Sequence, residues 1–226
     1  MPETADTYYK REFWSCENLK YARPHFRMEK AARLVRRIAH RKDCDLLDVG
    51  CGPATLRQLL PGNIHYHGID IATHAPDPNL IQTDFLEHPI RFGNKSFDII
   101  IAQGVFEYVG SFQSQKFLEI AQILKGNGTF VVSYVNFDHR NKQIYWPYNN
   151  TQSFDEFRQS LARFFHIDRL IPTSHRWHHD EPRGRLMKAI QMHITANIPF
   201  ISRSFAVEYF FICSLASSGK SQIRTQ

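Results

Sequence analysis

The chain has 226 residues, of which 42% are apolar, and this length suits one α/β domain with a sizeable core. It contains no run of roughly 20 consecutive apolar residues, the length that a membrane-spanning helix needs. The first 20 residues are polar, charged and aromatic, unlike a secretory signal. The four cysteines show no paired spacing, which favours reduced thiols in the cytoplasm. We expect a cytoplasmic protein without a membrane segment.

The net charge of +6 comes entirely from the N-terminal fifth of the chain, because residues 1–42 hold eleven Lys and Arg against five Asp and Glu. A basic segment can attract phosphates on nucleic acid or on a small substrate. Within residues 26–42, however, apolar side chains recur at helical spacing and the basic side chains fall largely on the other side. This pattern predicts an amphipathic helix, and a solvated basic face explains it without a ligand.

Strands and helices alternate along the rest of the chain. Predicted strands, rich in branched and aromatic residues, cover 44–50, 63–71, 79–85, 96–104, 128–137, 166–172 and 205–215. Predicted helices cover 53–60, 111–124, 153–165 and 185–196. The segment KGNG at 125–128 would end the second of these helices, and Ser153 with Glu156 would cap the third.

This alternation predicts an α/β fold whose parallel sheet is covered by helices on both faces. Residues 43–216 would form the sheet domain, residues 1–42 an N-terminal helical cap or lid, and residues 217–226 a disordered tail. In open sheets of this kind, ligands bind beyond the carboxyl ends of the strands. The residues that follow the first four strands are therefore the expected place for a site.

The first strand runs into a glycine-containing turn, in the sequence DLLDVGCGPATL at residues 45–56. Gly50 and Gly52 allow a sharp turn and a close approach of the backbone to a ligand. Asp48 can accept hydrogen bonds from N–H groups of the loop. A dinucleotide-binding loop would require a third glycine at position 55, where the chain has Thr55. The turn therefore disfavours a pyrophosphate ligand.

The next three predicted strands end in residues that suit a nucleoside. Asp70, at the end of the second strand, could accept hydrogen bonds from both hydroxyls of a ribose. Asp84 could accept one from an exocyclic amine, and Phe85 could lie against a ring. Gln103 and Gly104 offer amide and backbone groups after the fourth strand. Together these strand ends predict a nucleoside site that lacks a phosphate cradle.

The same segments resemble the class I S-adenosylmethionine-dependent methyltransferases, in particular the small-molecule type. LLDVGCGPATL is similar to the first motif of that family, GIDI to its acidic second motif, and QTDF to the segment that contacts adenine. FDIIIAQGVFEYV resembles the fourth-strand motif, and LKGNGTFVVSYVN the stretch leading into the fifth strand. The resemblance covers residues 43–136 well and continues loosely to 215. It implies a doubly wound, mostly parallel, seven-stranded Rossmann-like sheet with N-terminal helices and an antiparallel last strand.

The resemblance also implies that S-adenosylmethionine is the cofactor, whose amino-acid end has no diphosphate and needs no third glycine. Asp70 would hold the ribose hydroxyls, and Asp84 would accept from the adenine amine. The full set of implied cofactor contacts follows the first four strands: Asp48, Gly50, Cys51, Gly52, Asp70, Ile71, Asp84, Phe85, Gln103 and Gly104.

Methyl transfer to a hydroxyl requires a base that takes the proton of the acceptor, whereas an amine must only be unprotonated. Four side chains near the predicted strand ends are candidate bases: His139, His175, His178 and Glu107. The histidines of the SHRWHHDEP segment could instead bind zinc, or form a polar loop in which Asp180 caps the next helix. Nothing specifies a fourth ligand, so we expect no metal.

Two features of the fourth strand argue against nucleic-acid substrates. One RNA-methylating branch of the family has metal ligands where this chain has Gly104, Glu107 and Tyr108. The Asn-Pro-Pro-Tyr motif of enzymes that methylate amino groups of nucleic acids is also absent. Aromatic residues of the N-terminus and of the insert after the fifth strand could line a substrate pocket, or simply pack a lid onto the domain: Tyr9, Trp14, Tyr21, Tyr108, Tyr145 and Trp146.

The sequence therefore predicts a monomeric or homodimeric methyltransferase that acts on a small molecule, most readily by O-methylation of a specialised metabolite or sugar. One alternative is an RNA-modifying enzyme that uses the basic N-terminal helix. Others are N- or C-methylation of a small molecule, and a non-catalytic subunit that only binds the cofactor.

Overall fold

The computed structural model describes residues 24, 26–71, 77–136, 152–175 and 206–216. The predicted helix at 185–196, the insert after the fifth strand, residues 1–23 and the tail lie outside these residues. Within the described residues, no helix is both long and apolar enough to span a membrane.

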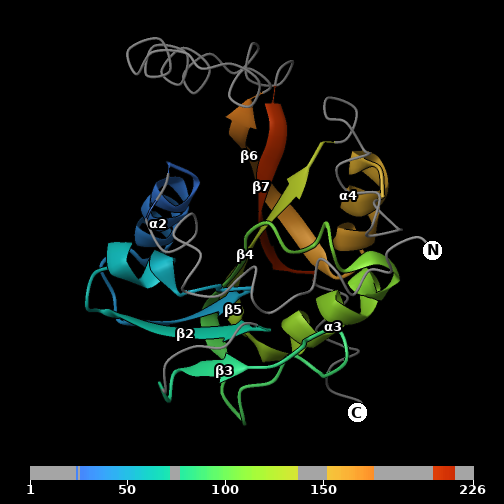
Figure 1. Cartoon of the computed structure of the whole chain (residues 1–226). Helices are drawn as coiled ribbons and strands as arrows, with labels where there is room; N and C mark the ends of the chain where they lie inside the picture. Colours follow the sequence, from blue (N-terminus) through green and yellow to red (C-terminus); the bar gives the residue numbers. More distant parts are fainter. Residues whose placement is uncertain (1–23, 25, 72–76, 137–151, 176–205, 217–226) are drawn as a thin grey trace, which may run out of the picture.

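A seven-stranded sheet forms the centre of the molecule (Figure 1), in the order β3-β2-β1-β4-β5-β7-β6. The strands β1 to β5 are parallel, and β7 runs antiparallel to both β5 and β6. The predicted mostly parallel sheet with an antiparallel last strand is thus confirmed. The strand bounds are β1 Cys44–Val49, β2 Ile64–Asp70, β3 Leu80–Gln82, β4 Phe97–Ala102, β5 Leu124–Val135, β6 Phe165–His175 and β7 Ala206–Leu215.

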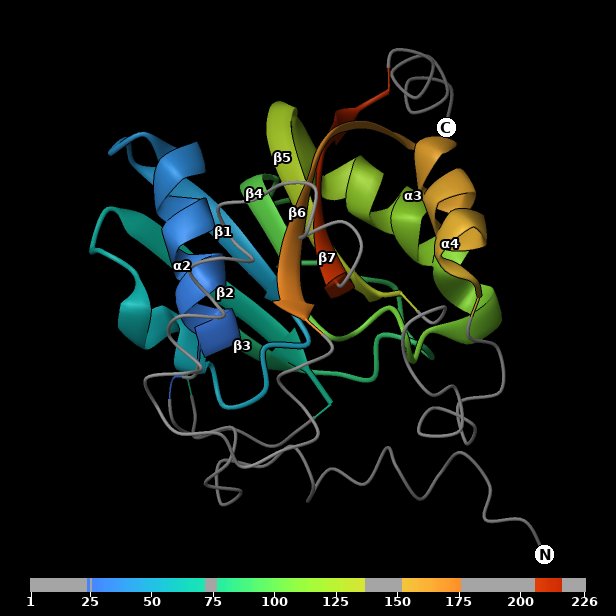
Figure 2. The same ribbon diagram turned by 90° about the horizontal axis from the view of Figure 1, so that it is seen from above.

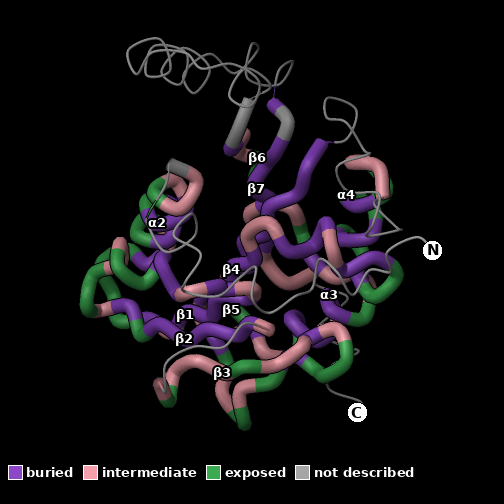
Figure 3. The backbone as a smooth tube through the Cα atoms, viewed as in Figure 1, coloured by how far each residue is buried: buried purple, intermediate pink, exposed green. Residues whose placement is uncertain are grey.

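Helices cover both faces of the sheet (Figure 2): α2 (Phe26–Ala39) lies on one face, and α3 (Gln113–Ile123) and α4 (Phe154–Ala162) lie on the other. Each face has its own apolar cluster, and the central strands β1, β2 and β4 are largely buried, whereas the edge strands β3 and β6 keep exposed residues (Figure 3). The cluster under α3 and α4 is rich in aromatic rings, with Phe106 stacked on Phe117 and Tyr134 stacked on Phe157. These two layers hold the carboxyl ends of the strands at one edge.

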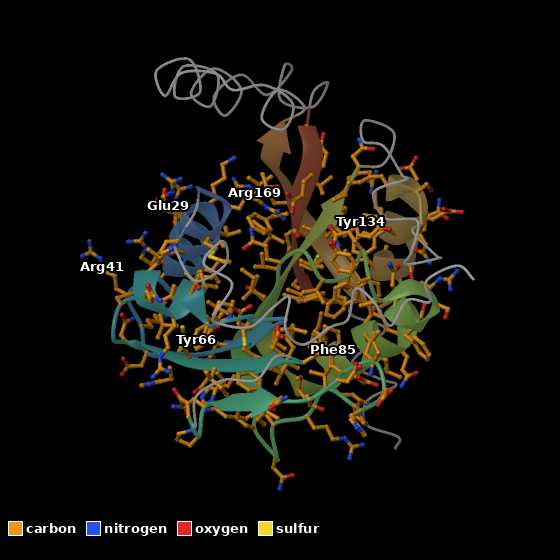
Figure 4. All side chains as sticks on the ribbon, viewed as in Figure 1. Glu29, Arg41, Tyr66, Phe85, Tyr134 and Arg169 are labelled. Carbon is orange, nitrogen blue, oxygen red and sulfur yellow. The ribbon has the colours of Figure 1, made fainter. Side chains whose placement is uncertain are left out.

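The amphipathic N-terminal helix is confirmed as α2. Its Ala31, Ala32, Leu34 and Val35 side chains are buried against the sheet, as their helical spacing predicts. Arg33, Arg36 and Arg37 are exposed on the other side, whereas Arg27 and Lys30, also predicted there, bind β7 and β6. Figure 4 shows Arg41, just beyond the helix, pointing away from the sheet. Because α2 contributes to a core cluster, this part of residues 1–42 packs directly on the sheet.

Two predicted elements near the carboxyl ends of β1 and β2 are shorter in the structure. The predicted helix at 53–60 is only a 3-10 turn, η3 (Thr55–Leu59), because Ala54 has a left-handed backbone (φ 53°) and leaves few residues before Pro61. The predicted strand at 79–85 is β3, of three residues. It ends early because Asp84 Oδ1 accepts a hydrogen bond from Leu86 N at 2.9 Å, which turns the chain.

The KGNG segment comes after the end of α3, as predicted, but it already belongs to β5, which begins at Leu124 directly after the helix. The segment interrupts the ladder with β4: Phe97 pairs with Leu124 and Ile99 with Thr129. The short 3-10 turn η4 (Gly110–Phe112) leads into α3. The predicted cap of α4 is confirmed, since Glu156 N donates to Ser153 Oγ and Ser153 N donates to Glu156 Oε2.

Candidate functional site

The candidate site lies where the strand order reverses, between β1 and β4, which is where ligands of doubly wound sheets are expected to bind. Gly50 follows β1 with a left-handed backbone (φ 74°), and its N–H donates to Ile69 O at 2.8 Å. A Cβ on Gly50 would overlap Cγ2 of Val105, in the loop after β4. The loops after the two strands are thus in direct contact, and only glycine fits at position 50.

Gly52 and Asp70 connect the ends of β1 and β2. The N–H of Gly52 (φ 52°) donates to Asp70 Oδ2 at 2.7 Å, and Asp70 is buried. Among the described residues, a Cβ built on Gly52 would meet nothing within 4 Å, so these residues leave the space beside the glycine open. The hydrogen bond fixes the Asp70 side chain against the turn, a role predicted from the sequence for Asp48, and the space leaves room for a ligand.

Asp48 faces the interior, where Tyr66 Oη donates to its Oδ2 at 2.7 Å. Burial raises the pKa of Asp48 to about 7, and the neighbouring Asp70 adds to this shift while the Tyr66 hydrogen bond opposes it. Cys51 is buried next to Asp48 and Tyr66, and burial raises the pKa of its thiol well above the ordinary value. The Asp48 side chain therefore links β1 to β2 through Tyr66.

The residues predicted to face adenine follow β3. Asp84 is half-buried, and its Oδ1 is already engaged by Leu86 N. Phe85 is only 8% exposed, and Figure 4 shows it between the sheet and α3. Ile71 is half-buried directly after β2. The core thus takes most of the Phe85 ring, whereas Asp84 and Ile71 keep exposed surface.

Gln103 and Gly104 follow β4 at the same edge. Gly104 has a left-handed backbone (φ 68°), and its N–H donates to Ser133 Oγ of β5 at 2.8 Å. Gln103 Nε2 is buried and has no hydrogen-bond partner among the residues that the structure describes. A buried amide without a partner is costly in a folded protein, so this group suits a ligand oxygen.

Sequence reasoning missed a buried ion pair beside this loop. Glu208, at the start of β7, is 1% exposed and pairs with Arg27 of α2. Burial would raise the pKa of Glu208, but the charge of Arg27 and the nearby polar side chains of Thr173 and Ser133 lower it below its ordinary value. The lone acid inside the apolar FAVEYFF run was the signal available in the sequence.

Only part of the predicted catalytic and substrate set lies in the described residues. Glu107 is 2% exposed and lies near Tyr134. Burial is the main cause that raises the pKa of Tyr134, and the charge of Glu107 raises it further. Tyr108 is half-buried against the core, and His175 ends β6, where its backbone pairs with Ala206. The other candidates lie outside the described residues: His139, His178, Tyr9, Trp14, Tyr21, Tyr145 and Trp146.

Metal-binding residues do not converge in the described part of the chain, where no three His, Cys, Asp or Glu side chains could hold an ion together. His178, His179 and Asp180 lie outside that part. The described residues do fit S-adenosylmethionine. A buried carboxylate at Asp70, the open space at Gly52 and the Gln103 amide match the polar groups of a nucleoside with an amino-acid tail.

Known proteins with this fold include many S-adenosylmethionine-dependent enzymes. A TehB-like methyltransferase from Corynebacterium glutamicum is 15% identical, with a TM-score of 0.54, over 94% of this chain and 98% of its own. The N-methyltransferase NodS from Bradyrhizobium japonicum, in complex with S-adenosyl-L-homocysteine, is 11% identical, with a TM-score of 0.57, over 93% and 99%. A putative methyltransferase bound to the Haloferax volcanii activator Trm112 is 17% identical, with a TM-score of 0.59, over 91% and 97%.

Identities this low show only the fold. The family is shown by a comparison of the sequence with family models. No curated protein matches the chain. A family model described as a methyltransferase domain matches residues 23–191, which include every described residue from α2 to β6. The chain therefore belongs to the class I S-adenosylmethionine-dependent methyltransferases.

Proposed function

We propose that this methyltransferase acts on a small molecule, with an oxygen atom as the favoured acceptor. The observation that carries this proposal is the polar character of the edge where β4 and β5 end. The Gln103 amide, the Ser133 hydroxyl and the Asn136 side chain are all buried or half-buried there. Such groups can orient a hydroxyl-bearing molecule, as the few polar anchors of a small-molecule pocket do.

The proposed chemistry needs little from the protein beyond position and one base. The cofactor supplies a methyl group on a positively charged sulfur. The new bond forms from the acceptor oxygen to that methyl carbon while the carbon–sulfur bond breaks, and the acceptor proton must go to a base. We propose His175, His178, His139 and Glu107 as candidates for this base, and Gln103 and Gly104 as residues that hold the reacting groups in line.

Glu107 differs from the histidine candidates in its surroundings. Because it is 2% exposed, direct proton transfer to it requires the acceptor or a water molecule to enter the space beside β4. A histidine has an ordinary pKa near neutrality, which suits a base at physiological pH. We therefore place the histidines before Glu107, with Tyr9, Trp14, Tyr21, Tyr108, Tyr145 and Trp146 as the proposed aromatic lining of the acceptor pocket.

One experiment tests the acceptor class directly. Cofactor with an isotopically labelled methyl group is incubated with the enzyme and with a cell extract from the source, separated into small-molecule, RNA and protein fractions. We expect the label in a small molecule whose mass increases by one methylene unit, on an oxygen atom. Label confined to the RNA or protein fraction would contradict the proposal.

RNA is the second candidate substrate, and the exposed side of α2 and the turn after it favours it. The basic side chains there form no ion pair with an acid among the described residues: Arg33, Arg36, Arg37, Arg41 and Lys42. A solvated face explains them equally well, and the fourth-strand loop lacks both nucleic-acid motifs. Binding of tRNA or rRNA that weakens steeply with salt and is lost on changing Arg37 and Arg41 to Glu would favour RNA.

Two neighbours suggest further alternatives. NodS is an N-methyltransferase, so an amine acceptor, like a carbon acceptor, is an alternative to oxygen. The neighbour from the Haloferax volcanii complex binds a methyltransferase activator, so a protein partner is an alternative to the proposed monomer or homodimer. The position of the labelled carbon in the product distinguishes the first pair. Sedimentation of the purified chain, alone and in extract, distinguishes the second.

A further inference from the structure

A buried ion pair of α3 lies against the loop that follows β3. Lys116 and Glu119 are one helical turn apart, and Lys116 Nζ donates to both carboxylate oxygens of Glu119, at 3.0 and 2.8 Å. Lys116 is completely buried and Glu119 is 9% exposed. Because desolvation offsets much of the attraction within a buried ion pair, the contacts that this pair makes outside the helix indicate its role.

Both members of the ion pair bind the backbone of residues 83–90, the β3 loop. Lys116 Nζ donates to His88 O at 3.0 Å, and Glu119 Oε2 accepts a hydrogen bond from Ile90 N at 3.0 Å. The ammonium thus binds a carbonyl and the carboxylate binds an N–H two residues further along the loop. These two charge-assisted hydrogen bonds fix the position and the direction of the β3 loop relative to α3.

The β3 loop carries the residues that are predicted to contact adenine. His88 N donates to Asp84 O, and Leu86 N donates to Asp84 Oδ1, both at 2.9 Å. Asp84 therefore begins a turn that ends at His88, the residue whose carbonyl Lys116 binds. Phe85, the next residue after Asp84, belongs to the core cluster between the sheet and α3 (Figure 4).

We propose that Lys116 and Glu119 are positioning residues for the adenine end of the cofactor. Thr83 N donates to Asp70 O at 2.8 Å, so β2 holds the first end of the β3 loop and the ion pair holds the last. The Asp84 carboxylate lies between these attachments, and its direction decides whether it accepts a hydrogen bond from the exocyclic amine. The ion pair acts through the loop backbone and does not touch the cofactor. This inference rests on the proposed contact between Asp84 and adenine, and not on the nature of the methyl acceptor.

A double variant removes the ion pair without leaving one charge alone. Lys116→Met with Glu119→Met replaces both buried groups by apolar side chains of similar volume, which is often neutral for stability. His88 O and Ile90 N then lose their partners in α3. Gln115→Ala is the matched control, because Gln115 Nε2 donates to Glu119 Oε1 at 3.0 Å but, among the described residues, makes no hydrogen bond to the β3 loop.

Titration calorimetry of the full chain compares S-adenosyl-L-homocysteine with its analogue in which hydrogen replaces the 6-amino group of adenine. We expect the wild type to bind S-adenosyl-L-homocysteine roughly fivefold more tightly, because the analogue lacks the hydrogen bond to Asp84. This affinity ratio should fall below about twofold in the double variant and in Asp84→Ala, and stay at roughly fivefold in Gln115→Ala. A general loss of stability affects both ligands alike, so the ratio reports the position of Asp84.

Hydrogen exchange locates the change in the chain. In the double variant, the amides of Leu86 and His88, which both donate to Asp84, should exchange faster than in the wild type. The amide of Gly52, which donates to Asp70 Oδ2, should exchange as in the wild type, because it lies at the ends of β1 and β2.

Glu119→Gln takes the place of the double variant if the latter does not fold. It keeps the size of the side chain but leaves one oxygen for donors that used two, so it should lower the affinity ratio in the same direction. A wild-type ratio together with unchanged exchange of the His88 amide in the folded variant would overturn the proposal. A ratio near one in the wild type would also overturn it, because Asp84 would then not contact the amine. Failure of the proposed acceptor is seen separately, in the labelling experiment.

Discussion

Gly50 and Gly52 make a matched pair for a test of the turn after β1, because both have left-handed backbones but different surroundings. Placing a Cβ on a left-handed residue costs about 1–2 kcal/mol. At Gly50 the new atom also overlaps Cγ2 of Val105, which is buried in the core and cannot move away freely. Overpacking of this kind adds about 1–3 kcal/mol. We therefore expect Gly50→Ala to lose about 2–5 kcal/mol of unfolding free energy, and Gly52→Ala about 1–2 kcal/mol.

Urea denaturation of both variants measures these losses, and the slope of each transition should stay unchanged. The double variant Gly50→Ala, Val105→Ala removes the overlapping methyl group and should recover part of the loss caused by Gly50→Ala. For cofactor affinity we expect the opposite order. Gly52→Ala should weaken binding more than Gly50→Ala, because its Cβ enters the open space proposed for the cofactor. If Gly50→Ala is as stable as Gly52→Ala, the close contact with Val105 is wrong.

Three further predictions concern two acids of the candidate site, the buried Asp48, and the buried Lys116 of α3. Asp70→Ala should weaken S-adenosyl-L-homocysteine roughly tenfold or more in calorimetry, and Asp84→Ala less, because Asp70 would lose two hydrogen bonds to ribose; equal negligible losses would contradict this. The pKa of Asp48 is raised to about 7, so its contribution to stability is present at low pH and is lost as pH rises from about 4 to 7. Asp48→Asn should therefore flatten that part of the pH profile of thermal unfolding. An unchanged profile would refute it. Lys116→Met should cost about 3–5 kcal/mol in urea denaturation, because it leaves the buried Glu119 without the ammonium 2.8 Å away; a loss below about 1 kcal/mol would contradict this.

The fold could be predicted from the sequence because each strand carries a local signal. The apolar run that ends in Val49 and the one that ends in Ala102 needed no tertiary information to be recognised as buried strands. The predicted lengths of two elements were wrong because local backbone conformation, and not hydrophobic pattern, determines where these elements end. The left-handed Ala54 shortens the helix expected after β1, and the side chain of Asp84 ends β3 early. Neither effect follows from hydrophobic periodicity.

The cofactor edge of the site could also be predicted, because parallel strands bring Gly52 and Asp70 to one edge whatever the detailed packing. The supporting partners could not. The sequence could not identify Tyr66 as the donor to Asp48, because the pairing register of β1 and β2 decides which of their side chains come into contact. Arg27 and Glu208 are 181 positions apart, and no pattern in a single sequence joins residues at that distance.

We infer that the edge formed by the ends of β1, β2 and β4 binds S-adenosylmethionine and not a dinucleotide. Calorimetric titration of the full chain with S-adenosyl-L-homocysteine and with NAD distinguishes the two ligands. We expect saturable binding of S-adenosyl-L-homocysteine and no heat of binding with NAD, because Thr55 stands where a pyrophosphate loop has its third glycine. Saturable binding of NAD without a response to S-adenosyl-L-homocysteine would contradict it.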